Sequence, residues 1–224
     1  MTGSTTPARE FKPALRFDSL TSMFDPVVAV TTRERTFKRL AIERAALQPG
    51  DQLLDLGCGT GTLALMAHAQ QPAATIVGLD ADPAILAQAR AKAAAAGVEL
   101  AFREGFSNRL PFEDGHFDVV LSTLFFHHLS DADKRATATE LMRVLAPGGR
   151  LVVADFGRPQ DPLMRFIAVA VVQVLDGRAT TNLNVAGRLP GVFADAGFDA
   201  VTVTERLRTP SGTIELLTAR RPAS

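Results

Sequence analysis

Residues 53 to 61 read Leu53-Leu54-Asp55-Leu56-Gly57-Cys58-Gly59-Thr60-Gly61, and this stretch decides the fold. An apolar run typical of a strand ends beside an acidic residue and continues into three glycines spaced two apart. Glycine has no Cβ, so the backbone can turn tightly here and a ligand can lie directly against it. A helix-like segment follows. The pattern predicts a ligand-binding turn at the carboxyl end of a parallel strand, the usual ligand edge of an open α/β sheet.

The spacing of the glycines indicates the kind of ligand. A dinucleotide turn needs Gly-x-Gly-x-x-Gly, whose helix start accepts a pyrophosphate. Here the spacing is Gly-x-Gly-x-Gly, and the carboxylate of Asp55 before it suits an ammonium group better than a phosphate. The nine residues resemble motif I of the class I S-adenosylmethionine (SAM) methyltransferases, whose ligand carries an amino acid and a sulfonium. An ordinary glycine turn without a ligand would fit a lone Gly-x-Gly better than this longer match.

Strands and helices alternate after Pro49-Gly50, which predicts a doubly wound, mostly parallel sheet of the α/β class. The expected strands are about 51–56, 74–79, 98–103, 116–121 and 149–154, and the expected helices between them are about 61–70, 83–96 and 130–145. A helix from Thr31 or Thr32 to about Leu47 precedes them. Asp82 before Pro83, and Ser130 before Asp131, are typical helix starts.

The alternation loosens in the last third of the chain. We expect an apolar helix from Pro162 to about Leu175, a loop containing Gly177, Asn182 and Asn184, and a short helix to Gly197. Runs at about 199–207 and 212–219 predict an antiparallel hairpin at the sheet edge, which completes a seven-stranded Rossmann-like sheet. No linker is long enough to divide the chain, so 1–224 is interpreted as one domain. Within it, 1–48 is expected to form a helical cap and 157–197 a variable substrate region.

Further segments extend the resemblance. Residues 110–120 (LPFEDGHFDVV), 125–129 (FFHHL) and 140–150 (ELMRVLAPGGR) are similar to the ubiquinone/menaquinone-type methyltransferases, and with motif I they cover about residues 50 to 156. The resemblance implies a class I methyltransferase fold and SAM as cofactor. Beyond residue 156 the likeness is weaker, and there the family varies its substrate pocket.

The resemblance also implies the cofactor contacts. Asp80, at the tip of the second strand, would accept the two ribose hydroxyls, and Ala81 would flank the adenine. The family usually has an acidic residue at the position of Phe106. Here either Phe106 packs on the adenine face, or Glu104 or Ser107 supplies the polar contact. The expected contacts are Asp55, Gly57, Cys58, Gly59, Thr60, Gly61, Asp80, Ala81, Phe106, Ser107 and Thr123.

Three side chains are candidates for moving a proton. His127 and His128 follow the fourth strand at the ligand edge, and Asp155 ends the fifth. Histidine titrates near neutral pH and is the usual general base, and the chain has no tyrosine to replace it. The alternatives are that one histidine packs while the other lines the cleft, and that Asp155 caps the next segment.

Composition limits the partners. The 24 basic and 24 acidic residues give a net charge of +0, which counts against nucleic acid as the main partner. Cys58 is the one cysteine, so intrachain disulfides and cysteine-rich metal sites are excluded. We expect it to be a small packing residue rather than a nucleophile. No metal site is evident. No segment is long enough to span a membrane, although contact with a lipid surface stays open. We expect a cytoplasmic monomer or homodimer.

The sequence therefore predicts a SAM-dependent methyltransferase that acts on a small molecule, lipophilic ones included, at a carbon, oxygen or nitrogen acceptor. The alternatives are a non-catalytic protein that binds SAM with the same fold, and an NAD-dependent oxidoreductase, which needs a different glycine spacing. A methyltransferase acting on nucleic acid or protein would need a basic groove or a motif such as Asn-Pro-Pro-Tyr, and the chain has neither.

Overall fold

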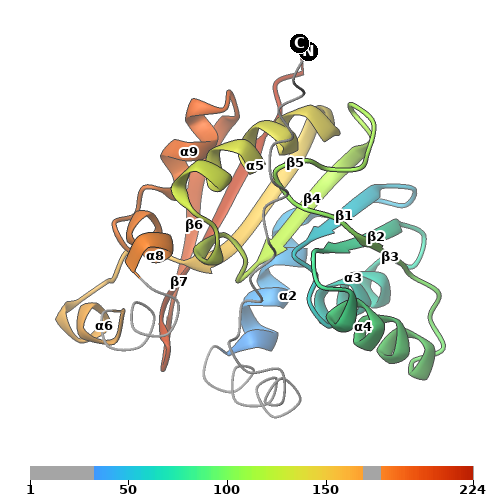
Figure 1. The fold of residues 1–224 in the computed structure, drawn as a ribbon, viewed down its shortest axis with the longest axis horizontal. Helices are drawn as coiled ribbons and strands as arrows, with labels where there is room; N and C mark the ends of the chain where they lie inside the picture. Colours follow the sequence, from blue (N-terminus) through green and yellow to red (C-terminus); the bar gives the residue numbers. More distant parts are fainter. Residues whose placement is uncertain (1–32, 169–177, 224) are drawn as a thin grey trace, which may run out of the picture.

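The computed structural model describes residues 33–168 and 178–223. One seven-stranded sheet organises them, in the order β3-β2-β1-β4-β5-β7-β6 (Figure 1). β7 pairs antiparallel with β5 and β6, and the other neighbours are parallel. The strands are β1 (Gln52–Leu56), β2 (Thr75–Asp80), β3 (Ala101–Glu104), β4 (Phe117–Thr123), β5 (Leu145–Phe156), β6 (Asp199–Thr209) and β7 (Gly212–Arg220). The predicted fold class, including the antiparallel hairpin at one edge, is confirmed.

The helices cover both faces of the sheet. They are α2 (Glu34–Ala45), α3 (Thr62–Gln70), α4 (Pro83–Ala95), α5 (Asp131–Val144), α6 (Pro162–Ile167), α8 (Arg178–Val185) and α9 (Leu189–Asp195), with a short 3₁₀ turn η1 (Phe126–His128). Strand residues alternate between two cores, because successive side chains point to opposite faces. Leu53, Val119 and Val152 join α2, α3 and α4 in one core. Leu54, Val120 and Val153 join α5 and α9 in the other.

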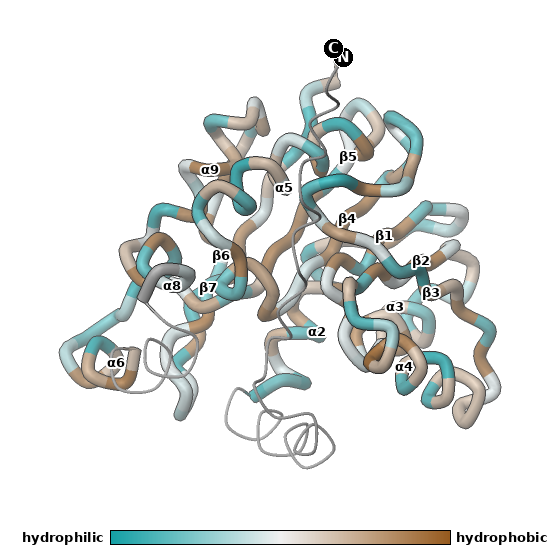
Figure 2. Tube along the Cα trace, viewed as in Figure 1, coloured by the Kyte–Doolittle hydropathy of each residue, from teal (hydrophilic) through white to brown (hydrophobic). Residues whose placement is uncertain are grey.

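The central strands are buried on both faces. The tube in Figure 2 is mostly hydrophobic along β4 and β5, as expected for parallel strands covered on both sides. Both predicted caps form. The Asp82 carboxylate accepts from the backbone N–H of Ala84 at 2.8 Å, and the Ser130 hydroxyl accepts from that of Asp133 at 3.1 Å. These caps fix where α4 and α5 begin, and therefore where the preceding strands can end.

The last third differs from the prediction in one element. The stretch with Asn182 and Asn184, expected to be a loop, lies in α8, so that prediction was wrong. Asparagine favours turns, but here Thr181, Leu183 and Asn184 are buried as α8 packs on η1 and β5, and these contacts override local preference. The apolar helix begins at Pro162 as expected and is described to Ile167. Its predicted continuation to Leu175, and the cap before residue 33, lie outside the described residues.

Candidate active site

The carboxyl ends of β1, β2, β4 and β5 meet at one edge of the sheet, since these strands are parallel. The glycine turn follows β1 at this edge. Gly57, Gly59 and Gly61 all have positive φ, at +69°, +52° and +74°, which glycine adopts readily and other residues rarely do. A Cβ on Gly57 would lie 2.4 Å from the Phe125 ring, whereas one on Gly59 would meet no described residue within 4 Å. The turn therefore packs through Gly57 and presents open backbone at Gly59.

Asp80 connects this turn to the neighbouring segments. Its carboxylate accepts from the backbone N–H of Gly59 at 3.0 Å and from that of Asp82 at 3.1 Å. Its carbonyl accepts from the Gly105 N–H at 3.0 Å. Burial raises the pKa of Asp80, and the backbone N–H donors partly offset this. A carboxylate offers about four acceptor positions, so Asp80 keeps acceptor capacity for a diol.

The residues expected around the adenine follow Asp80 or follow Gly105, whose N–H donates to the Asp80 carbonyl. Ala81 is half-buried beside it, and Phe106 directly follows Gly105. The Phe106 side chain is 52% exposed, one of few large apolar side chains left exposed in the described part of the chain. Ser107 is buried, and its hydroxyl lies 2.8 Å from that of Thr137 on α5. At this position the Phe106 ring is therefore exposed, whereas the Ser107 hydroxyl lies against that of Thr137.

Asp55 lies beneath the turn with one oxygen unsatisfied. The residue is 1% exposed, and its buried Oδ2 has no hydrogen-bond partner in the described part of the chain. Burial raises the pKa of Asp55 to about 7, with Lys38 and the Ala64 N–H acting in the opposite direction. A buried acceptor without a donor costs free energy, so this position suits an added donor such as an ammonium. SAM carries a ribose diol and an ammonium group. The spare acceptors of Asp80 fit the diol, the unsatisfied oxygen of Asp55 fits the ammonium, and the backbone at Gly59 is open to a ligand.

The remaining predicted contacts are Thr60, Cys58 and Thr123. Thr60 is half-buried, with its hydroxyl 3.4 Å from that of Thr62. Cys58 is buried, and burial raises its pKa, so the thiol stays protonated and fits the packing role better than a nucleophilic one. Thr123 ends β4 at the site edge, half-buried.

The three candidates for proton transfer lie together at this edge. His127 Nδ1 is 2.7 Å from Asp155 Oδ1, and both residues are buried, at 3% and 1% exposure. The other Asp155 oxygen accepts from the backbone N–H groups of Phe125, at 3.1 Å, and His127, at 3.3 Å. Burial disfavours the Asp155 carboxylate, but His127 and the backbone N–H of Phe156 lower its pKa overall. Asp155 thus fixes the η1 backbone and orients one imidazole.

His128 differs from its neighbour. Its ring centroid lies 3.9 Å from that of His127. Desolvation by the surrounding atoms, followed by the adjacent His127, lowers the pKa of His128, so this imidazole is neutral near pH 7. The residue still exposes part of its surface, and water there limits how far the pKa falls. The structure therefore pairs a carboxylate with His127 and leaves His128 at the outer side.

Two residues that the sequence analysis did not single out complete this edge. Asn184 of α8 is fully buried, yet neither of its amide atoms has a hydrogen-bond partner within residues 33–168 and 178–223. Lys134 of α5 is also fully buried, and its ammonium donates to the carbonyls of Leu129, at 2.9 Å, and Thr180. Lys134 thereby ties the segment after η1 to α8. Because α8 packs on η1, its buried face lies against the turn that carries His127 and His128.

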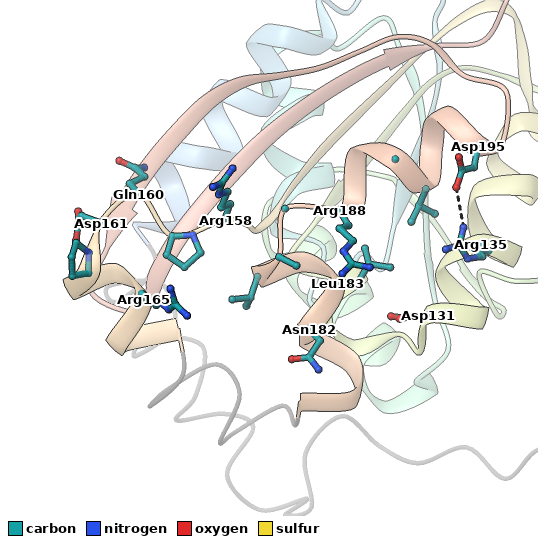
Figure 3. Close-up of a pocket in the computed structure, with 17 residues that line it drawn as sticks. Asp131, Arg135, Arg158, Gln160, Asp161, Arg165, Asn182, Leu183, Arg188 and Asp195 are labelled. Carbon is teal, nitrogen blue, oxygen red and sulfur yellow. Dashed lines mark hydrogen bonds and ion pairs between the residues drawn. The ribbon is translucent and has the colours of Figure 1, made fainter.

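A large cleft lies beside this region and does not include the predicted cofactor contacts. It measures about 1400 Å³ and runs between α6 on one side and α8 and α9 on the other (Figure 3). Among the described residues, no group of three or more His, Cys, Asp or Glu side chains could hold a metal ion. The same part of the chain contains no helix long and apolar enough to cross a membrane.

Comparison with known proteins agrees with this geometry. Residues 53–149 match the family model described as "Methyltransferase domain". A demethylmenaquinone methyltransferase of Thermus thermophilus is 46% identical over 123 residues, which are 55% of this chain and 55% of that protein. A ubiquinone/menaquinone biosynthesis C-methyltransferase of Ectopseudomonas mendocina is 32% identical over 190 residues, 83% of this chain and 71% of that protein.

A solved SAM-dependent methyltransferase from Methanosarcina mazei superimposes with a TM-score of 0.66 at 21% identity, over 82% of this chain and 97% of the other. At that identity the likeness concerns the fold alone. The family model covers the glycine turn, and the relative from Ectopseudomonas mendocina is matched over most of its length. The chain therefore belongs to the class I SAM-dependent methyltransferases, with SAM as its cofactor.

Proposed function

We propose that the protein methylates a lipophilic small molecule with a hydroxylated aromatic ring, of the reduced-quinone type. The observation that carries this proposal is the buried pair of His127 and Asp155 at the site edge, with 2.7 Å between Nδ1 and Oδ1. A base beside the cofactor serves a hydroxyl or carbon acceptor, whereas an amine needs much less help. The names of relatives matched at 46% and 32% identity point to the same class of acceptor.

SAM, when bound, supplies a methyl group already activated by the positive charge on sulfur. The residues of the chain then have to align the acceptor and move one proton. Asp155 holds the Nδ1–H tautomer of His127, so Nε2 is the atom that takes the proton of the acceptor hydroxyl. The Asp155 carboxylate stabilises the imidazolium that results. The acceptor becomes a phenolate, in which both the oxygen and the neighbouring ring carbons are nucleophilic.

Alignment completes the mechanism. The acceptor atom must lie about 3–3.5 Å from the methyl carbon, in line with the bond that breaks. We assign Asn184 a positioning role in this step. Its buried amide has a donor and an acceptor without partners, and a ring hydroxyl or carbonyl would satisfy them. Ala81 and Phe106 flanking the adenine, Asp80 binding the ribose and Asp55 facing the ammonium hold the other partner in this proposal.

The test compares His127→Asn with the wild type, using SAM and a soluble short-chain naphthoquinol. Asparagine can keep a hydrogen bond to Asp155 but cannot act as a base. We expect kcat to fall by about a hundredfold or more, the acid limb of the pH–rate profile to disappear, and SAM affinity to stay unchanged. His116→Gln is the matched control, because His116 lies in the turn before β4 and packs on Phe112 and Phe117.

A purely structural role for the pair predicts a different result. The melting temperature of His127→Asn would fall, while the shape of the pH–rate profile would match that of the wild type. Tight SAM binding with no transfer to any quinol would support the non-catalytic alternative instead. The remaining proposals, a cytoplasmic location, a monomer or homodimer and no nucleic-acid partner, are compatible with the balanced charge of the chain.

A further inference from the structure

Helix α6 presents an apolar surface to solvent. Met164 is 4% exposed, whereas Leu163 is 57% and Phe166 is 69% exposed. Residues three apart lie on neighbouring turns of one helix face, so Leu163 and Phe166 form one patch. In the described part of the chain Phe106 is the one other large apolar side chain with comparable exposure, and the proposed site accounts for it. No described residue gives the α6 patch such an explanation.

Unpaired arginines lie next to this patch. Arg158, Arg165 and Arg188 line the neighbouring cleft, are exposed, and have no acidic partner among the described residues. The acidic residues of the cleft are each paired with a cation: Asp195 with Arg135 at 3.1 Å, Asp161 with Arg208 at 3.2 Å, and Asp131 with Lys134 at 3.7 Å. The cleft therefore has a positive surplus, although the whole chain has a net charge of +0.

The arrangement of the three arginines indicates the kind of partner. Arg158 belongs to the connection between β5 and α6, Arg165 to α6, and Arg188 to the connection between α8 and α9. Figure 3 shows them along both sides of the cleft rather than pointing at one spot. A single small anion would need converging donors. Separated guanidinium groups beside exposed apolar side chains suit a partner whose surface carries many anionic groups.

We propose that α6 and the adjoining arginines form a docking face for an anionic lipid bilayer. Leu163 and Phe166 would enter the boundary between headgroups and acyl chains, and the arginines would contact lipid phosphates. Because α6 follows the carboxyl end of β5, this face lies at the sheet edge that carries Asp155. The docking face rests on the proposed function, since a lipophilic acceptor would be taken from the membrane.

The test is sedimentation of the full chain with phosphatidylcholine vesicles, with and without phosphatidylglycerol. We expect binding to the anionic vesicles that weakens as salt is raised and little binding to the neutral ones. Leu163→Ser combined with Phe166→Ser should weaken binding more than tenfold. Each of Arg158→Gln, Arg165→Gln and Arg188→Gln should weaken it about fivefold. All these positions are exposed, so circular dichroism should show unchanged folding.

The matched control is Arg220→Gln. Arg220 is exposed and pairs with Arg150 in the sheet register, at the end of the β5–β7 pairing that is farther from α6. Equal loss of binding in this control, or equal binding to neutral and anionic vesicles, would overturn the docking face. So would release of the protein by inorganic phosphate at constant ionic strength, which would indicate a site for one small anion. RNA that binds the protein and releases it from vesicles of either composition would indicate a nucleic-acid surface instead.

The docking face and the proposed function can fail separately. Methylation of a soluble quinol by the wild type, without vesicle binding, would reject the docking face and keep the methyltransferase proposal. Vesicle binding without turnover would keep the docking face and reject the methyltransferase proposal. The α6 variants should keep the wild-type affinity for SAM, because none of the changed residues belongs to the expected cofactor contacts.

Discussion

At the scale of single residues, two carboxylates at the same sheet edge have opposite environments. Asp155 accepts from His127 and from three backbone N–H groups, and its pKa lies below the usual range. Asp55 has an oxygen without a partner among the residues that the structure describes, and burial raises its pKa to about 7. Such separation is typical of sites in which neighbouring acids have different tasks. Asp155 can support a positive imidazole, while Asp55 costs stability until a donor reaches it.

The raised pKa of Asp55 predicts how stability depends on pH. Between about pH 4 and pH 7 the folded protein keeps a proton that the unfolded chain releases, so stability falls as pH rises, by about 1.4 kcal/mol per unit at most. Asp55→Asn removes this term. We expect the melting temperature of the variant minus that of the wild type to increase by several degrees from pH 5 to pH 8, measured without SAM.

The matched control for Asp55→Asn is Asp199→Asn, which changes an exposed carboxylate. The pH dependence of its melting temperature should follow that of the wild type. Asp155 does not interfere in this range, since its lowered pKa removes stability only as pH falls below about 4. A constant difference between Asp55→Asn and wild type across the range would show that Asp55 is already ionised in the folded protein.

At the scale of elements, sequence patterns predicted the turns, caps and strands whose positions depend on residues close together in the chain. The glycine turn, the caps at Asp82 and Ser130, and the strands from β1 to β5 carry their own signals of spacing and residue type. The position of α8 does not, because two asparagines favour a loop until the helix packs on η1. The unsatisfied amide of Asn184 is a consequence of burial, and the pairing of His127 with Asp155 joins residues 28 positions apart. No local sequence pattern contains either feature.

Asn184 offers a prediction at this scale. Asn184→Leu removes an unsatisfied buried amide and keeps a similar volume, so the free energy of unfolding should rise by about 1–3 kcal/mol. The KM for the quinol should rise tenfold or more, while SAM affinity stays unchanged. Thermal denaturation, acceptor titration and calorimetry measure the three quantities. Greater stability with an unchanged KM would show that the amide has no part in acceptor binding.

Asn182→Leu on the same helix is the control, because Asn182 is exposed whereas Asn184 is fully buried. We expect it to leave KM unchanged. Improved stability coupled to weaker acceptor binding is the result expected where a residue serves function at a cost to the fold.

At the scale of the whole molecule, the proposed cofactor site is built from separate segments that the sheet brings to one edge. Asp80 alone contacts the turn after β1, the start of α4 and the segment after β3. A ligand that binds across these segments binds the folded chain and not the unfolded one, so it stabilises the entire domain. The response of global stability to ligand is therefore a direct measure of whether this edge holds SAM.

Thermal denaturation with SAM, with NAD and without ligand makes that measurement. At a SAM concentration of about a hundred times Kd, linkage contributes about 2.7 kcal/mol, or an increase of roughly 5–10 °C in a domain of this size. Asp80→Ala should weaken SAM affinity more than tenfold and so reduce the increase to half or less at the same concentration. Asp199→Ala should keep it in full, and NAD should produce none. An equal increase with NAD, or an unchanged one in Asp80→Ala, would mean that the ligand does not lie against the β2 tip.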